Sequence, residues 1–419
     1  MTQGGKRGHG GAAPMPITDV ALRGILDSRG HPTLEADVWL GEVRGRGSCP
    51  VAIAPGRLER RRRLRTGALG PLRDSETGRL LRDELAGLKP GQEELDARLR
   101  ELDDRHGVGA DATLAVSLAH ARAAAAVAGR PLHAWLADRA GSTPGLPRLL
   151  VNAFSGGIHG TAAPDSFQQI MIIPESGSVL DDVRIALDVY AALERTMADG
   201  SGAAPISASS GLLPGGRDLA WQLRTLDRTR AAAPAALGVD VAAEHLRTER
   251  GYRFQGREHG PAEFAALLLE LVRAHGIQYV EDPFDPADTG AWEAFLPAAR
   301  QAGAAVVGDD LFASDAGRVR PGLADAVLLK PSQAGTVTAT LAAARAARDL
   351  GLRLAVSHRS GETEDTAMCD LAVAVGAEWI KIGGPRRGDR IAKYNQLIRL
   401  TETLTSEGAA CRVPSSSKI

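Results

Sequence analysis

Short β-rich runs alternate with helix-forming segments through most of the chain, and this pattern restricts the possible folds more than any other feature. About eight such runs lie between residues 149 and 382, separated by segments rich in Ala, Leu and Arg. The runs cover residues 149–153, 169–173, 237–241, 279–280, 304–307, 326–329, 352–356 and 379–382. About eight strands with intervening helices are typical of a (β/α)8 barrel. The pattern therefore predicts an α/β protein built around a barrel.

The N-terminal part of the chain has a different pattern. Residues 17 to about 46 alternate as strands around a turn at residues 28–32, whereas residues 57–137 have helical spacing of their apolar side chains. Gly and Pro become frequent over residues 141–147, which indicates a domain boundary. Residues 1–14 are rich in Gly and contain no apolar stretch, so we expect a disordered tail rather than a signal peptide.

Composition excludes several classes of protein. The net charge is −1, so no bulk field favours nucleic acid or an anionic membrane surface. No apolar run approaches the roughly 20 residues that span a bilayer. Cys49, Cys369 and Cys411 are scattered and have neither metal spacing nor a disulfide pattern. We therefore expect a cytoplasmic protein with no nucleic-acid or membrane partner.

Polar residues follow six successive apolar runs. Three of these residues are acids, and the next three positions are basic; in chain order they are Asp240, Glu281, Asp309, Lys330, His358 with Arg359, and Lys381. The carboxyl ends of parallel barrel strands meet at one face of the barrel. Neighbouring acids repel unless a cation lies between them, and hard oxygen ligands suit Mg²⁺. The order therefore predicts a Mg²⁺ site beside two lysines, suited to abstracting a proton next to a carboxylate.

Lysine is rare in this chain, which makes the positions of Lys330 and Lys381 more informative. Only six of the 50 basic residues are lysine, and Lys330 and Lys381 both end apolar runs. A desolvated lysine can act as a base, whereas arginine cannot be deprotonated in a protein. Chance retention of these two lysines is the plainer alternative.

Several motifs make the chain resemble the enolase family over residues 15 to about 405. They are ILDSRGHPT (25–33), GGIH (156–159), VEDPF (280–284), GDDL (308–311), LLK (328–330), SHRSGETEDT (357–366) and AKYNQL (392–397). The resemblance implies an N-terminal α+β capping domain over residues 15–140 and a modified barrel over residues 145–419. It also implies a homo-oligomer, a dimer or an octamer, and a small phosphorylated or phosphonate carboxylate as the substrate.

The same resemblance implies roles for individual residues. Asp240, Glu281 and Asp309 would hold one Mg²⁺, Lys330 would be the base, and Lys381 would support the charge of the carboxylate and the enediolate. Arg359 and Ser360 match residues that bind the phosphate. The remaining matches would contact the substrate or assist catalysis: His159, Gln168 and His358.

Three departures from the family pattern are expected to change the reaction. Gln169 replaces a glutamate, and Ser209 replaces the glutamate that protonates the departing hydroxyl in enolases. No Glu occurs between Gly200 and Gly216, so a shift of the alignment does not restore the acid. Ala54 replaces a lid serine that binds a second Mg²⁺, which makes a second ion doubtful.

Three functions remain open from the sequence. The first is a specialised enzyme that forms an enediolate of a phosphoglycerate-like or phosphonate substrate, as in carboxyphosphonoenolpyruvate synthesis. The second is a genuine enolase that dehydrates 2-phosphoglycerate with an acid from elsewhere. The third is a binding or scaffold protein that has lost catalysis. Retention of the buried acids and lysines argues against the third, because buried charges are costly without their partners.

Overall fold

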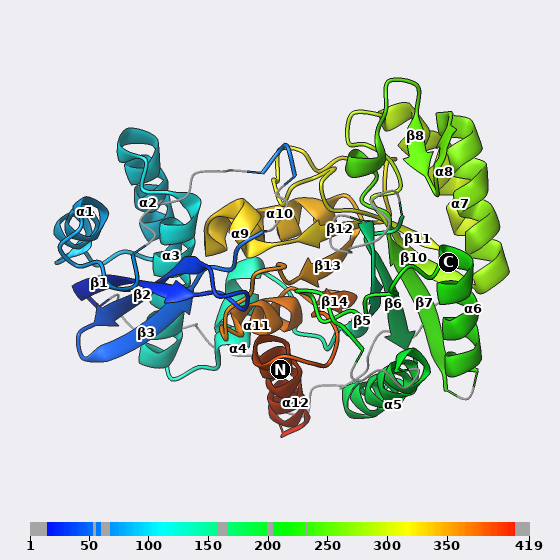
Figure 1. The fold of residues 1–419 in the computed structure, drawn as a ribbon. Helices are drawn as coiled ribbons and strands as arrows, with labels where there is room; N and C mark the ends of the chain where they lie inside the picture. Colours follow the sequence, from blue (N-terminus) through cyan, green and yellow to red (C-terminus); the bar gives the residue numbers. More distant parts are fainter. Residues whose placement is uncertain are drawn as a thin grey trace, which may run out of the picture.

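The computed structural model describes residues 15–52, 56–59, 68–157, 166–198, 204–231 and 233–406. A small antiparallel sheet with helices at the N-terminal end lies against a larger closed barrel (Figure 1). The predicted tail over residues 1–14, the lid residue Ala54 and the predicted site residue His159 lie outside the described residues.

The N-terminal domain is a four-stranded sheet covered by helices. Its strands are β1 (Ile17–Leu26), β2 (Pro32–Leu40), β3 (Val43–Ser48) and β4 (Gly70–Pro71), in the order β3-β2-β1-β4. Its helices are α1 (Glu76–Leu85), α2 (Gln92–His106), α3 (Ala110–Val127) and α4 (Leu132–Ala140). Leu and Val from the sheet pack against the apolar faces of α1, α2 and α3 in one core, whereas Trp135 and Leu136 of α4 belong to the core around the barrel.

Helix α3 approaches β3 closely because two glycines face it. A Cβ atom on Gly45 would lie 1.9 Å from the carbonyl oxygen of Ala119, and one on Gly47 would lie 2.5 Å from that of Ala115. The absent side chains therefore allow the helix backbone to pack directly on the strand.

Eight strands close into a barrel in the order β10-β11-β12-β13-β14-β5-β6-β7. They are β5 (Arg148–Ser155), β6 (Gln169–Pro174), β7 (Ala235–Asp240), β10 (Ile277–Glu281), β11 (Ala305–Gly308), β12 (Ala326–Leu329), β13 (Arg353–Ser357) and β14 (Trp379–Lys381). Strand β6 pairs antiparallel with both β5 and β7, and the other neighbours are parallel. The predicted α/β barrel is therefore confirmed, in a modified form with one reversed strand.

Helices and a small hairpin connect these strands. The helices are α5 (Val179–Met197), α6 (Leu219–Arg230), α7 (Pro261–His275), α8 (Thr289–Gln301), α9 (Pro331–Ala334), α10 (Val337–Asp349), α11 (Ala367–Ala374) and α12 (Gly388–Ser406), with a 3-10 turn η2 at Ala243–Leu246. The hairpin pairs β8 (Tyr252–Phe254) with β9 (Arg257–His259). Each of the eight β-rich runs predicted between residues 149 and 382 overlaps a barrel strand, because these runs are buried inside the ring of helices.

No single helix among the described residues is long and apolar enough to cross a bilayer. Helices α3 and α4 together reach the required length and composition, but the chain bends by 104° between them.

Candidate active site

Three buried acids lie where neighbouring barrel strands end. Asp240 is the last residue of β7, Glu281 is the last residue of β10, and Asp309 follows β11 directly. Asp240 and Glu281 are register partners across their parallel strands. Their exposed fractions are 2% and 1%, and that of Asp309 is 6%. The structure therefore brings the three predicted metal ligands to one end of the barrel.

The two predicted lysines lie between these acids. The Lys381 Nζ atom, at the end of β14, donates to Asp240 Oδ2 at 2.7 Å and to Glu281 Oε1 at 2.8 Å. Lys330 directly follows β12, and its Nζ atom forms an ion pair with Asp309. Burial disfavours the ammonium form of both lysines, but the neighbouring carboxylates outweigh it, and the pKa of each amine lies above its usual value.

The donor set fits a hard divalent cation. Three carboxylates face two lysines, so negative charges outnumber positive charges in this group. Burial, followed by the repulsion of Asp240, raises the pKa of Glu281 to about 8, although Lys381 opposes the shift. A cation held by Asp240, Glu281 and Asp309 would relieve this repulsion, and Mg²⁺ prefers such oxygen ligands.

Asp282 and Asp310 form a second acidic group with Asp309. Among the described residues, these three offer carboxylate oxygens that all lie within 4.8 Å of one another. Asp282 has a left-handed backbone with φ of 42°, and its carboxylate accepts the backbone N–H groups of Asp309 and Asp310, each at 2.9 Å. Because both of its oxygens are engaged, Asp282 is better placed to hold the turn than to bind an ion.

Sequence reasoning did not assign Asp282 or Asp310 to the site. The signal was present, since Asp282 lies inside the VEDPF motif and Asp310 directly follows a predicted ligand. The motif does not reveal the hydrogen bonds from the backbone of Asp309 and Asp310 to the Asp282 carboxylate, because these join the ends of two neighbouring strands.

A basic side chain, that of Arg359, lies beside the lysines in the loop that follows β13. Its Nη1 atom donates to Ser332 Oγ at 3.0 Å, and its Nη2 atom donates to Glu59 Oε2 at 2.7 Å. Burial opposes the charge of Arg359, but Glu59 stabilises it, and the pKa of the guanidinium is raised. A buried, permanently charged guanidinium suits a phosphate or phosphonate group.

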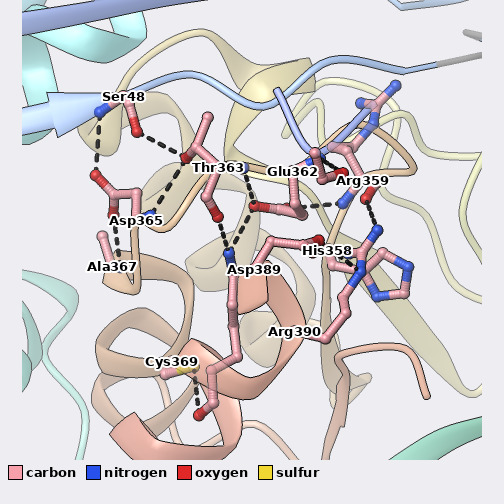
Figure 2. Close-up of polar contacts among 12 residues, drawn as sticks. Ser48, His358, Arg359, Glu362, Thr363, Asp365, Ala367, Cys369, Asp389 and Arg390 are labelled. Atoms are coloured by element: carbon pink, nitrogen blue, oxygen red, sulfur yellow. Dashed lines mark hydrogen bonds and ion pairs between the residues drawn. The ribbon is translucent and has the colours of Figure 1, made fainter. Parts of the chain in front are cut away.

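The turn around Arg359 is supported from below by Arg390 (Figure 2). Arg390 is fully buried in α12, and its Nη2 atom donates to the carbonyl oxygens of Arg359 and Ser360 at 2.9 and 3.1 Å. It also reaches the carbonyl of Ala208 at 3.1 Å, so one guanidinium connects two loops of the site. The predicted phosphate-binding pair, Arg359 and Ser360, is therefore held in place by its backbone.

The same loop is attached to the N-terminal domain further along. Asp365 accepts a bidentate ion pair from Arg122 of α3, at 2.6 and 2.7 Å, and the backbone N–H of Ser48 at 3.0 Å. The hydroxyl groups of Ser48 and Thr363 lie 2.7 Å apart (Figure 2). One short segment thus belongs both to the candidate site and to the domain interface.

His358, Ser209 and Gln168 complete the predicted set among the described residues. The His358 Nδ1 atom lies 2.9 Å from the carbonyl oxygen of Lys381, which can only accept, so Nδ1 carries the proton. Its Nε2 atom lies 3.3 Å from Ser209 Oγ. Gln168 donates from Nε2 to Asp240 Oδ2 at 3.2 Å. The structure therefore places all three beside the acids and lysines.

Among the described residues, the position where the sequence lacks a proton donor is occupied by two neutral side chains, those of Ser209 and His358. Burial, and then the positive charges of Arg390 and Lys381, hold the pKa of His358 well below its usual value. The imidazole is therefore neutral, and Ser209 donates its hydroxyl proton to Nε2. Over residues 204–216 no acid is present to replace the glutamate.

Comparison with known proteins adds independent findings. Residues 17–136 match the family model described as "Enolase, N-terminal domain", and residues 144–413 match "Enolase, C-terminal TIM barrel domain". Proteins named "Enolase" from Thermococcus gammatolerans, Pyrococcus furiosus and Thermococcus kodakarensis are 36%, 37% and 35% identical over 424 aligned residues. Each alignment covers 95% of this chain and 96% of the relative.

Proposed function

Because the chain belongs to the enolase family, we propose that it is a Mg²⁺-dependent enzyme that forms an enediolate of a small phosphorylated or phosphonate carboxylate. The observation that supports this most strongly is the interleaving of the predicted acids with Lys330 and Lys381 at one end of the barrel. We further propose a cytoplasmic homo-oligomer, a dimer or an octamer, on the family resemblance alone.

Each residue has a chemical task in this proposal. Lys330 first loses its own proton and then takes the proton next to the substrate carboxylate, and Lys381 stabilises the resulting negative charge. Asp240, Glu281 and Asp309 would hold the cation, which supplies positive charge for the carboxylate and the enediolate when it is bound. The remaining residues contact the substrate: Arg359 and Ser360 at the phosphate or phosphonate group, with Gln168, His159 and His358 around the reacting carbon.

We propose that ordinary dehydration of 2-phosphoglycerate is inefficient. A positioned general acid contributes about 10² to 10⁴ in rate, and expulsion of hydroxide needs one. Ser209 instead donates its own proton to a neutral His358. A specialised reaction that retains the enediolate step, such as carboxyphosphonoenolpyruvate synthesis, is compatible with this arrangement.

Genuine enolase activity is the second candidate. It is favoured by 37% identity to a protein named enolase over 95% of the chain. In this alternative, a water held by Ser209 or His159 would supply the proton that the missing glutamate normally provides.

Hydrogen–deuterium exchange at the carbon next to the carboxylate tests the proposal separately from dehydration. The chain is incubated with 2-phosphoglycerate and Mg²⁺ in D₂O, exchange is followed by NMR, and phosphoenolpyruvate is measured in the same samples. We expect exchange in the wild-type protein and a loss of about 10² to 10⁴ in Lys330→Ala. The control is Lys89→Ala, which removes an exposed lysine of the N-terminal domain and should leave exchange unchanged.

The two measurements separate the candidates. Equal exchange in the wild-type protein and Lys330→Ala would contradict the proposed base. Phosphoenolpyruvate formation within tenfold of an ordinary enolase would instead favour the second candidate and show that the missing glutamate has been replaced.

A further inference from the structure

One side of the barrel mouth is built from uncharged side chains, which we call the neutral wall. It consists of Asn152, Ser155, Gln168, Gln169, Ser207 and Ser209. Gln169 is the register partner of Asp240 on one side and of Ser155 on the other. Register partners present their side chains on the same face of a sheet. The neutral wall is therefore continuous with the charged group formed by Asp240, Glu281 and Lys381.

Hydrogen bonds within the neutral wall fix the direction of several donors. The Ser207 Oγ atom accepts the backbone N–H groups of Ser209 and Gly211, each at 3.2 Å. Its own hydroxyl proton is then directed to Ser155 Oγ at 2.8 Å. Asn152 Nδ2 also donates to Ser155 Oγ, at 3.0 Å. The serines are thus engaged by one another and by Asn152.

Three amide oxygens of the wall are buried and accept no hydrogen bond from the residues that the structure describes. They are Asn152 Oδ1, Gln168 Oε1 and Gln169 Oε1. The orientation of Gln168 is fixed, because its Nε2 atom donates to a carboxylate, which can only accept. A buried acceptor without a partner costs about 1–3 kcal/mol. Three of them in one wall indicate a surface that acquires its donors from a ligand.

Ser209 contributes a further acceptor to this surface. Its proton points to His358 Nε2, so the lone pairs of its oxygen remain available. A positively charged ligand group is disfavoured at the wall, because Lys381 lies next to it and would repel a second cation. An uncharged donor, a hydroxyl or a carboxamide, therefore suits the wall best.

We propose that the neutral wall binds a hydrogen-bond-donating, uncharged substituent of the substrate, and that this substituent stays attached during the reaction. This inference rests on the proposed function, in which the charged group and Arg359 bind the carboxylate and the phosphate or phosphonate. It differs from a dehydration site, where the group at this position is protonated and leaves. The residues of the wall can accept hydrogen bonds from such a substituent, but none of them is an acid that could protonate a leaving group.

Calorimetric titration with two matched ligands tests the neutral wall. The full chain with saturating Mg²⁺ is titrated with 2-phosphoglycerate and with 2-phospholactate, which has a methyl group in place of the hydroxymethyl group. Absorbance is used to confirm that no phosphoenolpyruvate accumulates. We expect 2-phosphoglycerate to bind about tenfold more tightly or better, because only it carries the hydroxyl donor.

Variants of the wall should abolish this preference. In Gln169→Leu and in Ser209→Ala we expect the two ligands to bind within about twofold of each other, mainly through weaker binding of 2-phosphoglycerate. The matched control is Gln301→Leu at the exposed end of α8, which should keep the wild-type preference. Melting temperatures identify any variant that fails to fold, and Ser209→Ala, which removes one oxygen, provides the milder test.

Failure of this inference is distinct from failure of the proposed function. Equal binding of both ligands by the wild-type protein would overturn the neutral wall and leave the proposed function standing. A preference that persists in both wall variants would also overturn it. Binding of neither ligand would overturn the proposed function and the inference together.

Discussion

At the scale of single residues, the carboxylate of Asp282 holds the turn that carries Asp309. It accepts the backbone N–H groups of Asp309 and Asp310, and its own backbone is left-handed. In Asp282→Ala, we expect the affinity for Mg²⁺ to fall by about 10- to 100-fold, as for residues that orient metal ligands. Isothermal titration with Mg²⁺ alone measures this. Asp315→Ala, which removes an exposed acid nearby, is the control, and an equal affinity in both variants would show that Asp282 has no orienting role.

A second residue, His120, makes stability depend on pH. It is 2% exposed in α3, and its Nδ1 atom lies 2.8 Å from Gln92 Oε1. Burial, with help from the charge of Arg139, lowers the pKa of His120 from 6.5 to about 4. On acidification, His120 therefore binds a proton near pH 6.5 in the unfolded chain but only near pH 4 in the folded chain. Stability should fall as the pH decreases through this window, by about 3 kcal/mol for this group.

Urea unfolding at pH 7 and at pH 4.5 measures the contribution of His120. We expect His120→Gln to lose less stability than the wild-type protein on acidification, since it has no group to protonate. The control is His106→Gln, at the exposed end of α2, which should lose as much as the wild-type protein. An identical loss in all three proteins would mean that His120 is not the group responsible.

The sequence could predict most residues of the candidate site but not their partners. Asp240, Glu281 and Lys381 were predicted because each ends an apolar run, and strand ends meet at one face of a barrel. The contact of Lys381 with Asp240 joins residues 141 positions apart. It depends on closure of the barrel, which no local pattern encodes. The buried acceptors of the neutral wall were not predicted for the same reason.

At the scale of secondary-structure elements, the contact between α3 and β3 in the N-terminal domain leaves no room for a side chain at Gly45. We expect Gly45→Ala to lower the free energy of unfolding by about 1–3 kcal/mol, because its Cβ would overlap the backbone of α3. Urea unfolding measures this change. The matched control is Gly290→Ala in α8, where a Cβ meets nothing within 4 Å, and it should be neutral or slightly stabilising. A neutral Gly45→Ala would show that α3 can move away from the strand.

The barrel strands were predictable, but the direction of β6 was not. An apolar run such as Gln169–Pro174 is buried on both faces whichever way it points, so its sequence is the same for a parallel and an antiparallel neighbour. Its direction depends on whether the chain crosses over or reverses between β5 and β6, which the sequence did not show. The hairpin of β8 and β9 was also missed, because each strand has only three residues.

At the scale of the whole molecule, the loop after β13 joins the candidate site to the N-terminal domain. Arg359 lies at one end of this loop and Asp365, paired with Arg122, lies near the other. We expect Arg122→Ala to lower kcat/KM by about tenfold to a hundredfold, because a small displacement of a binding group reduces catalysis. The rate of deuterium exchange into 2-phosphoglycerate, followed over a range of concentrations, measures this change.

The control for this coupling is Arg130→Ala. It breaks an exposed ion pair with Asp138 in the same domain without touching the loop. If both variants have wild-type kcat/KM, the domain interface does not position Arg359. If both lose activity equally, the effect comes from general destabilisation of the domain.

Because the barrel mouth is divided into a charged group and a neutral wall, we expect it to distinguish between the two enantiomers of its substrate. The carboxylate, the phosphate and the uncharged substituent would each have a separate place, and Lys330 approaches from a fixed direction. When a tetrahedral carbon carries three different substituents, only one enantiomer can place each substituent at its own position and also direct the hydrogen atom toward Lys330. The mirror-image compound would present its hydrogen atom away from the amine.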